Sequence, residues 1–394
     1  MNKIEGIKIV SKTKHIDVDD QTKESHIDVA QKKDNPESKK NTATVTSAKS
    51  EEAQTQINAN EDTVNPNDVE STKVLFMGTG KFAGHILDEI LKHGEANIVE
   101  VMTQPDKKIG RKKSSIHRTL ADNPVRDIAV KHEINLFQPN KLDTTAITRI
   151  KKLNPDAIMV ASYGKILPKE ILDIPKIGVF NAHTSLLPKL RGASPVQNAL
   201  LLGLKETGVT IMKMDEGMDT GDIIIQEKTD IKEHEKADEL LARLSKIAAD
   251  LIVKTAPKLI DGSITATPQD NSKATMCQLI DREDGHIQWT LTTEEIYNRY
   301  RAMYPWPGIF SYWEETENQL MRIKLRAIYP VSTELTPEQQ QMTAGTVFIG
   351  HDQLCIKTFD GAIIVEAVQP ECKTVMPVYD FLNGHKTFEG AILK

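Results

Sequence analysis

An asparagine and a histidine at alternate positions, Asn181 and His183, follow directly after the apolar run Ile177–Phe180. Such a run is typical of a buried strand, so both polar side chains are expected on one face at its carboxyl end. His183 can carry a proton near neutral pH, and the Asn181 amide can donate a hydrogen bond to a developing oxyanion. The pair indicates transfer of an acyl-type group. Taken alone, a buried histidine or asparagine is more often a structural, hydrogen-bonded core residue.

The elements that must position this pair alternate between short apolar runs and amphipathic segments. This βα rhythm predicts a doubly wound, Rossmann-like α/β domain over residues 71–260, in which ligands bind at the carboxyl edge of the parallel strands. The predicted strands are Lys73–Met77, Ile98–Thr103, Ala157–Ala161, Ile177–Phe180, Thr207–Met214 and Asp222–Thr229. The predicted helices are Phe82–Lys92, Thr119–Lys131, Thr145–Lys152, Pro195–Leu202 and Lys236–Leu259.

Two longer motifs surround the Asn181–His183 pair. The first, Asn181–Pro188 with Arg191-Gly192, resembles the active-site signature of the folate-dependent formyltransferases. The second, Met214–Asp222, lies about thirty residues further on and resembles the second signature of the same family. The resemblance implies transfer of the formyl group of 10-formyltetrahydrofolate to an amine, with no metal.

The resemblance also implies a role for each matched residue. Asn181 would donate to the oxyanion, and His183 would share that role and relay a proton. Asp219 would hold His183 in its useful tautomer, or position a water between the amine and the folate nitrogen N10. The implied folate contacts are Tyr163, Gly164, Ile166, Ser185, Leu186, Leu187 and Pro188.

Two residue patterns in these motifs permit other chemistry. Ser185 lacks the G-x-S-x-G turn of a nucleophilic serine, and we expect it to turn the chain so that the following residues wall the pterin. The acids Asp215, Asp219 and Asp222 could hold a cation, but their spacing matches no calcium loop. No metal site is therefore expected.

A glycine pattern near the start of the domain nominally meets the dinucleotide-binding fingerprint. Gly78-x-Gly80-x-x-Ala83 follows a strand, and Glu100 lies about twenty residues on, where an acid that binds ribose would stand. A lone fingerprint is weak, because the first βα turn of any doubly wound domain favours glycine. We expect this turn to lie beside the acceptor and not to bind NAD(P).

A basic run, Lys107–Arg118, contains six Lys or Arg residues and no acid. Most charge runs are solvated loops, but lysine and arginine also supply the sequence-independent part of nucleic-acid binding. The segment resembles the loop by which methionyl-tRNA formyltransferases reach the acceptor end of tRNA, although Ser115–Asn123 departs from that pattern. The implied tRNA contacts are Lys107, Lys108, Arg111, Lys112 and Lys113, with Arg111 at the position of the functional arginine.

A second domain is predicted after a linker at 261–275. Residues 276–394 contain a helix at Thr293–Ala302, the motif Tyr304-Pro-Trp-Pro-Gly308 and short alternating segments that indicate a small β-barrel. The alternating segments are Gln319–Ala327, Gly345–Ile349, Leu354–Thr358 and Ala362–Val368. The resemblance implies an OB-like tRNA-binding domain, although acids slightly outnumber Lys and Arg there.

Composition separates the first 70 of the 394 residues from the rest of the chain. They contain no aromatic residue, cysteine or arginine, so they cannot bury enough apolar surface to fold. We expect a disordered polar tail, with a partner-docking arm or an unusual targeting segment as the alternatives. The net charge of −6, three scattered cysteines and no membrane-length apolar run favour a cytoplasmic enzyme, expected to be a monomer.

The acceptor distinguishes the competing members of the family. A glycinamide ribonucleotide enzyme would lack the second domain, a sugar-nucleotide enzyme would lack the basic loop, and a formyltetrahydrofolate dehydrogenase would need a third domain. The loop, Tyr304–Gly308 and the barrel favour methionyl initiator tRNA as the acceptor, for translation initiation. A catalytically inactive tRNA-binding relative is the alternative from another class, and intact Asn181, His183 and Asp219 argue against it.

Overall fold

The computed structural model describes residues 72–94, 96–106, 123–317, 319–350 and 352–394, with the backbone of 108–109 and 119–120. The tail predicted for residues 1–70 lies outside these residues. So do Lys107, Arg111, Lys112, Lys113 and the side chain of Lys108 in the basic loop.

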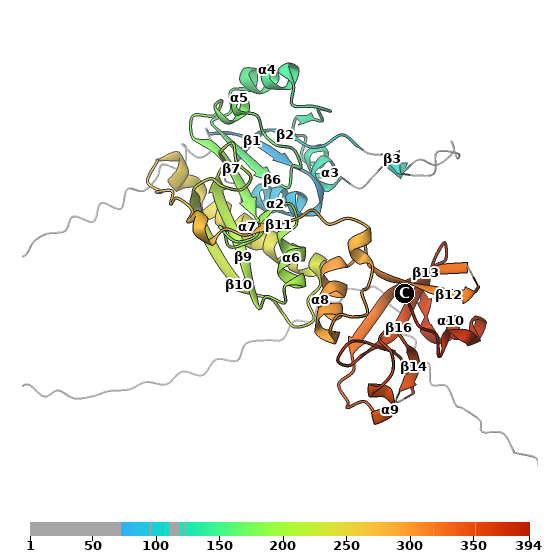
Figure 1. Cartoon of the computed structure of the whole chain (residues 1–394). Coiled ribbons are helices and arrows are strands. Elements are labelled where there is room, and N and C mark those ends of the chain that lie inside the picture. Colours follow the sequence, from blue (N-terminus) through green and yellow to red (C-terminus); the bar gives the residue numbers. More distant parts are fainter. Residues whose placement is uncertain are drawn as a thin grey trace, which may run out of the picture. The chain divides into compact units, whose positions relative to one another are not determined.

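Seven of the described strands form one mixed sheet in the order β10-β9-β7-β6-β1-β2-β5 (Figure 1). Strands β7, β6, β1, β2 and β5 run parallel, and β9 and β10 extend one side antiparallel. The strands are β1 (Lys73–Gly78), β2 (Asn97–Met102), β5 (Leu136–Phe137), β6 (Ala157–Ala161), β7 (Gly178–His183), β9 (Glu206–Lys213) and β10 (Ile223–Asp230). The predicted α/β domain is confirmed, whereas β5 was not predicted.

Helices cover both faces of this sheet, which explains why its central strands are almost continuously apolar. Phe76 of β1 faces a core shared with α2 (Gly80–His93) and α7 (Ala237–Ile260). Its neighbours Leu75 and Met77 face a second core shared with α4 (Thr144–Leu153) and α5 (Lys169–Leu172). Figure 1 shows α2 and α7 on one side of the sheet and α4 and α5 on the other.

The helix after β4, α3, starts later than the sequence predicted. The prediction placed a helix over Thr119–Lys131, but Thr119–Leu120 form strand β4 paired with β3 (Lys108–Ile109), and α3 spans Pro124–Lys131. Asn123 caps this helix by accepting a hydrogen bond from the Arg126 backbone N–H at 3.3 Å. The residue before a proline disfavours the helical backbone conformation, so Asn123-Pro124 sets the start of α3.

The glycine-rich turn after β1 has a structural role. A Cβ on Gly78 would lie 2.6 Å from Ala83 Cβ and 2.8 Å from Phe76, so glycine is required where β1 meets α2. Glu100 is buried on β2 and accepts three hydrogen bonds from Arg149, the shortest at 2.7 Å. Its carboxylate is therefore engaged by a guanidinium and not presented to a ribose.

The second domain contains an antiparallel sheet in the order β12-β13-β16-β15-β14, with β17 paired to β16. Backbone hydrogen bonds from Val347 N to Ala391 O (2.8 Å) and from Tyr312 N to Lys394 O (3.0 Å) cover both edge strands with residues 391–394. The predicted OB-like sheet is confirmed as a half-barrel, although β12 was not predicted. The strands are β12 (Ile309–Thr316), β13 (Gln319–Pro330), β14 (Val347–Gly350), β15 (Gln353–Lys357), β16 (Ala362–Pro370) and β17 (Met376–Pro377).

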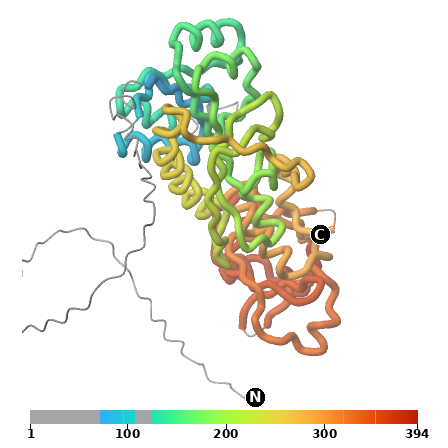
Figure 2. The backbone as a smooth tube through the Cα atoms, turned by 90° about the vertical axis from the view of Figure 1, so that its left-hand side faces the viewer, coloured from blue at the N-terminus to red at the C-terminus, as the bar shows by residue number. Residues whose placement is uncertain are grey.

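Short helices complete the chain and connect its two sheets. Helix α6 packs against α8, and Leu201 at the end of α6 contributes to the cores of both domains. Before entering the second domain, the chain after α7 returns along the first (Figure 2), where β11 pairs with β8. These elements are α6 (Pro195–Leu201), α8 (Thr293–Met303), α9 (Pro337–Gln340), α10 (Val378–Gly384), β8 (Arg191–Gly192) and β11 (Met276–Cys277).

Candidate active site

The carboxyl end of β7 presents Asn181 and His183 on the sheet face opposite Phe180 and Ala182, which belong to the α2–α7 core. Asn181 is partly exposed, and among the described residues its side-chain amide has no hydrogen-bond partner. Its two N–H groups are therefore available to a substrate oxygen. Backbone pairing of Asn181 with Val160 of β6 and Met212 of β9 fixes its position at this edge.

The His183 ring is buried, with 6% of the side chain exposed, and its two nitrogens face different groups. Nε2 lies 2.9 Å from the carbonyl oxygen of Leu190. A carbonyl only accepts, so Nε2 carries the proton and donates it to Leu190. In neutral His183 the free lone pair is therefore on Nδ1, which lies 3.6 Å from Asp219 Oδ2. A backbone carbonyl, and not Asp219, sets the tautomer.

Asp219 lies in the turn between β9 and β10 and has the left-handed backbone angle φ +55°. Its Oδ2 accepts a hydrogen bond from the Gly192 backbone N–H at 2.8 Å. Gly192 itself has φ +116°, and a Cβ there would lie 2.4 Å from Cys277 O, so this donor requires glycine. The carboxylate is thus anchored by the backbone on one side and faces His183 Nδ1 on the other.

The segment Ser185–Lys189 turns the chain away from β7. Ser185 is 1% exposed and its hydroxyl donates to Lys189 O at 2.6 Å, so it stabilises the turn and is not presented as a nucleophile. Thr210 on β9 holds the same turn, donating to Ser185 O at 2.7 Å and accepting from Leu187 N at 3.2 Å. Of the predicted folate contacts here, Leu187 is buried and Leu186 and Pro188 are partly exposed.

The other predicted folate segment follows β6, the strand beside β7. Tyr163 is buried, its hydroxyl has no hydrogen-bond partner in the part of the chain that the structure describes, and burial raises its pKa to about 12. Gly164 has φ +74°, and Ile166 is 80% exposed. The Gln104 amide donates to Tyr163 O at 2.9 Å and so ties this loop to the end of β2. The two predicted folate segments therefore lie at one edge of the sheet.

Three cationic side chains lie along strand β13, although acids outnumber Lys and Arg in this domain as a whole. Arg322, Lys324 and Arg326 alternate with the buried residues Ile323 and Leu325, so they share the outer face of the sheet. Burial and the neighbouring charges of Arg322, Arg326 and Arg282 lower the pKa of Lys324.

Aromatic rings lie beside these cations. The Arg326 guanidinium lies 5.7 Å from the Tyr304 ring centroid, and Trp306 of the same cis-proline segment is 58% exposed. Lys324 Nζ donates to the Pro307 carbonyl at 2.6 Å, which holds this segment against β13. We call Arg282, Arg322, Lys324, Arg326 and Trp306 the β13 cluster.

Sequence reasoning missed the residues behind the catalytic turns. Arg191 is buried and donates to Gln269 Oε1 and Asn271 Oδ1, and Thr275 accepts from Leu190 N at 2.9 Å. These partners come from the predicted linker, where no motif marked them. The one available signal was Arg191 itself, because a buried guanidinium needs oxygen acceptors from elsewhere in the chain.

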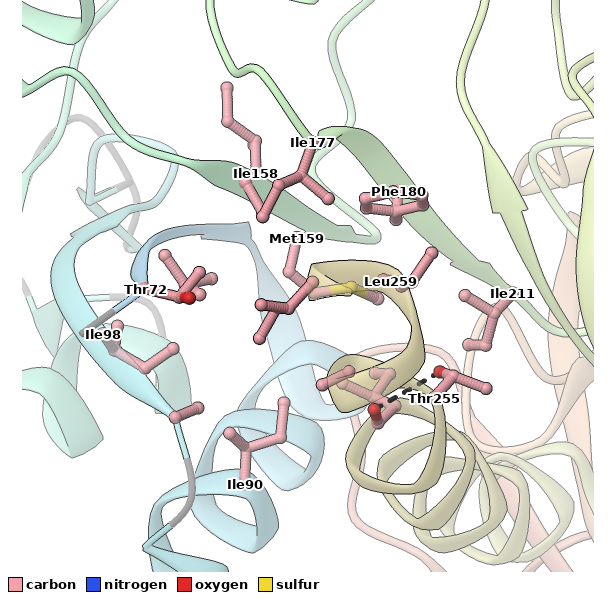
Figure 3. A pocket seen from close by; sticks show the side chains of 16 residues that line it. Thr72, Ile90, Ile98, Ile158, Met159, Ile177, Phe180, Ile211, Thr255 and Leu259 are labelled. Carbon is pink, nitrogen blue, oxygen red and sulfur yellow. Dashed lines mark hydrogen bonds between the residues drawn. The ribbon is translucent and has the colours of Figure 1, made fainter. Parts of the chain in front are cut away.

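An apolar cavity of about 80 Å³ lies at the amino ends of the parallel strands, beneath the last turns of α7 (Figure 3). Its polar lining residues are Thr72 and Thr255, and Thr255 donates to Leu251 O at 2.7 Å. None of the predicted site residues lines it, so we do not assign it to the substrates. Among the described residues, no group of three His, Cys, Asp or Glu side chains could hold a metal ion.

Comparison with known families defines the class of protein that this fold and site represent. The family model described as formyl transferase matches residues 72–256. The model of the formyl transferase C-terminal domain matches residues 279–386. Together they define a two-domain formyltransferase.

Curated relatives then identify the branch of that class. The methionyl-tRNA formyltransferase of Caldicellulosiruptor saccharolyticus is 40% identical, over 81% of this chain and 99% of the relative. That of Thermodesulfovibrio yellowstonii is 38% identical, over 81% of this chain and 98% of the relative. The chain therefore belongs to the methionyl-tRNA formyltransferase family, as its motifs indicated.

Solved structures support the fold alone, because their sequence identity is low. HypX from Aquifex aeolicus superposes with a TM-score of 0.54 at 16% identity, over 80% of this chain and 49% of that protein. The sugar 3N-formyl transferase WlaRD superposes with a TM-score of 0.52 at 21% identity, over 77% of this chain and 99% of that protein.

Proposed function

We propose that the protein transfers the formyl group of 10-formyltetrahydrofolate to the α-amino group of methionyl initiator tRNA. The observation that carries this is the arrangement around β7, where the Asn181 amide, which has no partner among the described residues, lies on the same strand face as His183, whose Nδ1 faces Asp219. Membership of the methionyl-tRNA formyltransferase family supports the same donor and acceptor.

The donor supplies a formyl carbonyl that becomes an oxyanion when an amine adds to its carbon. The Asn181 amide N–H groups have no acceptor among the described residues, and they donate to that oxygen. Its position on a strand paired on both sides keeps the donor in place before the reaction starts. One such preorganised donor typically contributes a factor of roughly 10²–10³ in rate.

His183 receives the proton that the attacking amine must lose. An α-amino group has a reference pKa of about 7.7–8.0, so part of it is neutral and nucleophilic without a strong base. After attack the nitrogen becomes acidic, and Nδ1 of His183 is the lone pair available to take its proton. The imidazolium then faces the Asp219 carboxylate, which stabilises the charge until the proton moves to the leaving nitrogen.

The residues around β6 and β7 fit a folate. The Tyr163 side chain is buried and, among the described residues, its hydroxyl has no hydrogen-bond partner, so its ring supplies an apolar wall beside Gly164. Gly164 leaves room for close approach, since a Cβ there would meet no atom nearer than 4.0 Å. We propose that Tyr163, Gly164 and Ile166 on one side, and Leu186, Leu187 and Pro188 on the other, hold the pterin. Ser185 shapes the second wall through its turn.

The tRNA is held by positive charge at two places. The basic loop, with Lys107, Lys108, Arg111, Lys112 and Lys113, follows β2, whose carboxyl end lies at the same sheet edge as the site. The β13 cluster adds a second cationic surface with an exposed tryptophan, a combination suited to phosphates and unstacked bases.

Charge reversal in the loop tests the first contact. Arg111→Glu is expected to raise the KM for tRNA and to leave the affinity for folate unchanged, because phosphate repulsion acts only on the tRNA. Steady-state kinetics with each substrate varied in turn measures both effects. Unaltered tRNA kinetics would remove Arg111 from the interface.

Charge reversal in the β13 cluster tests the second contact. Arg326→Glu is expected to weaken tRNA binding and to flatten its salt dependence by about one phosphate contact. Lys386→Glu changes the net charge equally and lies outside the cluster, so it serves as the control. Equal effects of the two variants would show that only net charge matters.

We propose residues 71–260 as the catalytic domain, 261–275 as the connection and 276–394 as the tRNA-binding domain, acting as a cytoplasmic monomer. No helix of the described residues has enough length and apolar character to cross a membrane. Sedimentation of the purified chain, alone and with tRNA, measures the oligomeric state.

A transfer assay tests the proposed function directly. The protein is incubated with 10-formyltetrahydrofolate and, in parallel, with methionyl initiator tRNA, a UDP-amino sugar or glycinamide ribonucleotide. Formyl on the methionine alone supports the proposal. Formyl on the sugar would keep the site chemistry and overturn the acceptor, and tRNA binding without any transfer would support the inactive binding protein.

A further inference from the structure

The segment between the two domains lies against the catalytic turns. After α7, Thr267 pairs with Ile223 at the start of β10, and β11 pairs with β8 beside Gly192. Between these two points the chain carries Gln269, whose side chain is partly buried. The sequence indicated only a linker here, but the backbone pairing at both ends holds this segment in place.

The Gln269 side chain joins the two turns that form the site. Its Oε1 accepts from Arg191 Nε at 3.1 Å and from Arg191 Nη2 at 2.7 Å. Its Nε2 donates to the carbonyl oxygens of Asp219 at 2.9 Å and Gly221 at 2.6 Å. One side chain therefore connects the residue before Gly192 to the residue that carries the carboxylate.

The chemistry of the partners leaves one orientation for this amide. A guanidinium only donates and a carbonyl only accepts, so the amide oxygen must face Arg191 and the nitrogen must face Asp219. Arg191 is buried, and no carboxylate of the described residues lies within 4.0 Å of it, so its acceptors here are neutral. Gln269 is thus oriented by Arg191 and in turn holds the Asp219 turn.

Asp219 needs this support because of its backbone. Its left-handed φ of +55° is unfavourable for a non-glycine residue, and the turn around it is partly exposed. The two contacts that fix it, Gly192 N–H to its carboxylate and Gln269 to its carbonyl, both depend on the Arg191-Gly192 segment. Loss of one contact leaves the carboxylate free to rotate away from His183.

We propose that Gln269 is a positioning residue for formyl transfer, which keeps the Asp219 carboxylate facing His183 Nδ1. The inference rests on the proposed function and adds to it that the connecting segment is part of the catalytic apparatus. The hydrogen bonds of the Gln269 side chain go to Arg191, Asp219 and Gly221. Its effect on the reaction passes through Asp219.

Gln269→Glu keeps the hydrogen bonds from Arg191 and removes those to the Asp219 turn. The carboxylate still accepts from Arg191, so that side of the site is retained, but it cannot donate to the carbonyls of Asp219 and Gly221. We expect kcat to fall by up to about 10²-fold, the cost of a misplaced catalytic group, with little change in the KM for either substrate. Gln278→Glu is the matched control, because it makes the same change at an exposed residue of the same segment, away from Arg191 and the Asp219 turn.

A double-mutant cycle distinguishes positioning from general stability. If Gln269 acts through Asp219, Gln269→Glu should have almost no further effect in an Asp219→Asn background. A full additional loss there, or an equal loss in Gln278→Glu, would overturn the inference, and so would an unaltered kcat in Gln269→Glu. Thermal melting of each variant shows that the fold is retained. Failure of the wild-type protein to transfer formyl to any acceptor would instead reject the proposed function itself.

Discussion

Replacement of His183 by alanine is expected to lower kcat by roughly 10²–10⁴-fold, the range of a lost acid–base group. The physical reason is the proton on the attacking nitrogen, which has no other acceptor as well placed as Nδ1. The ring also loses its hydrogen bond to Leu190 O, so the turn after β7 is weakened. Single-turnover transfer with saturating folate and charged tRNA measures the loss without interference from product release.

Binding measurements distinguish this loss of catalysis from a loss of substrate affinity. Affinity for methionyl initiator tRNA should be unchanged in His183→Ala, because the predicted tRNA contacts lie in the basic loop and the β13 cluster. His132→Ala is the matched control, since His132 is an exposed histidine at the end of α3. Wild-type turnover by His183→Ala would reject the proposed proton path.

The fold was predictable where local pattern and tertiary burial agree. The alternation of Leu75, Phe76 and Met77 between two cores reflects a strand covered on both faces, and the apolar run in the sequence already indicated it. The start of α3 was not predicted because helical periodicity was followed through Asn123-Pro124, where the proline and the cap decide the boundary. Strand β5 is two residues long and carries too little pattern to detect.

The site was predictable only in its reactive residues. Asn181 and His183 stand at the end of a recognisable strand, so their types and spacing already favoured oxyanion and proton chemistry. The tautomer of His183 depends on a carbonyl seven residues further on, placed by the left-handed backbone of Leu190, φ +58°. Gln269 reaches the site from about fifty residues beyond Asp219. Contacts of this kind arise from tertiary packing and are not marked by a local sequence pattern.

Because Leu190 O sets the tautomer of His183, the effect of Asp219→Asn on the reaction can be predicted. In a serine-protease triad, where the aspartate holds the histidine tautomer, the same change costs about 10⁴ in kcat. Here Leu190 O sets the tautomer, so only the stabilisation of the imidazolium should be lost. We expect kcat to fall by roughly 10²–10³-fold, the cost of one electrostatic partner.

Comparison of two substitutions at Asp219 separates charge from position. In Asp219→Asn the new amide oxygen can still accept from Gly192 N–H, whereas Asp219→Ala loses this contact as well. Asp219→Ala should therefore lose more activity than Asp219→Asn, and the difference in single-turnover rate measures the anchoring by Gly192. A loss of about 10⁴-fold in Asp219→Asn, as in the serine-protease triad, would mean that the carboxylate controls the ring after all. A smaller loss would leave the Leu190 carbonyl as the group that keeps Nδ1 ready to accept the proton.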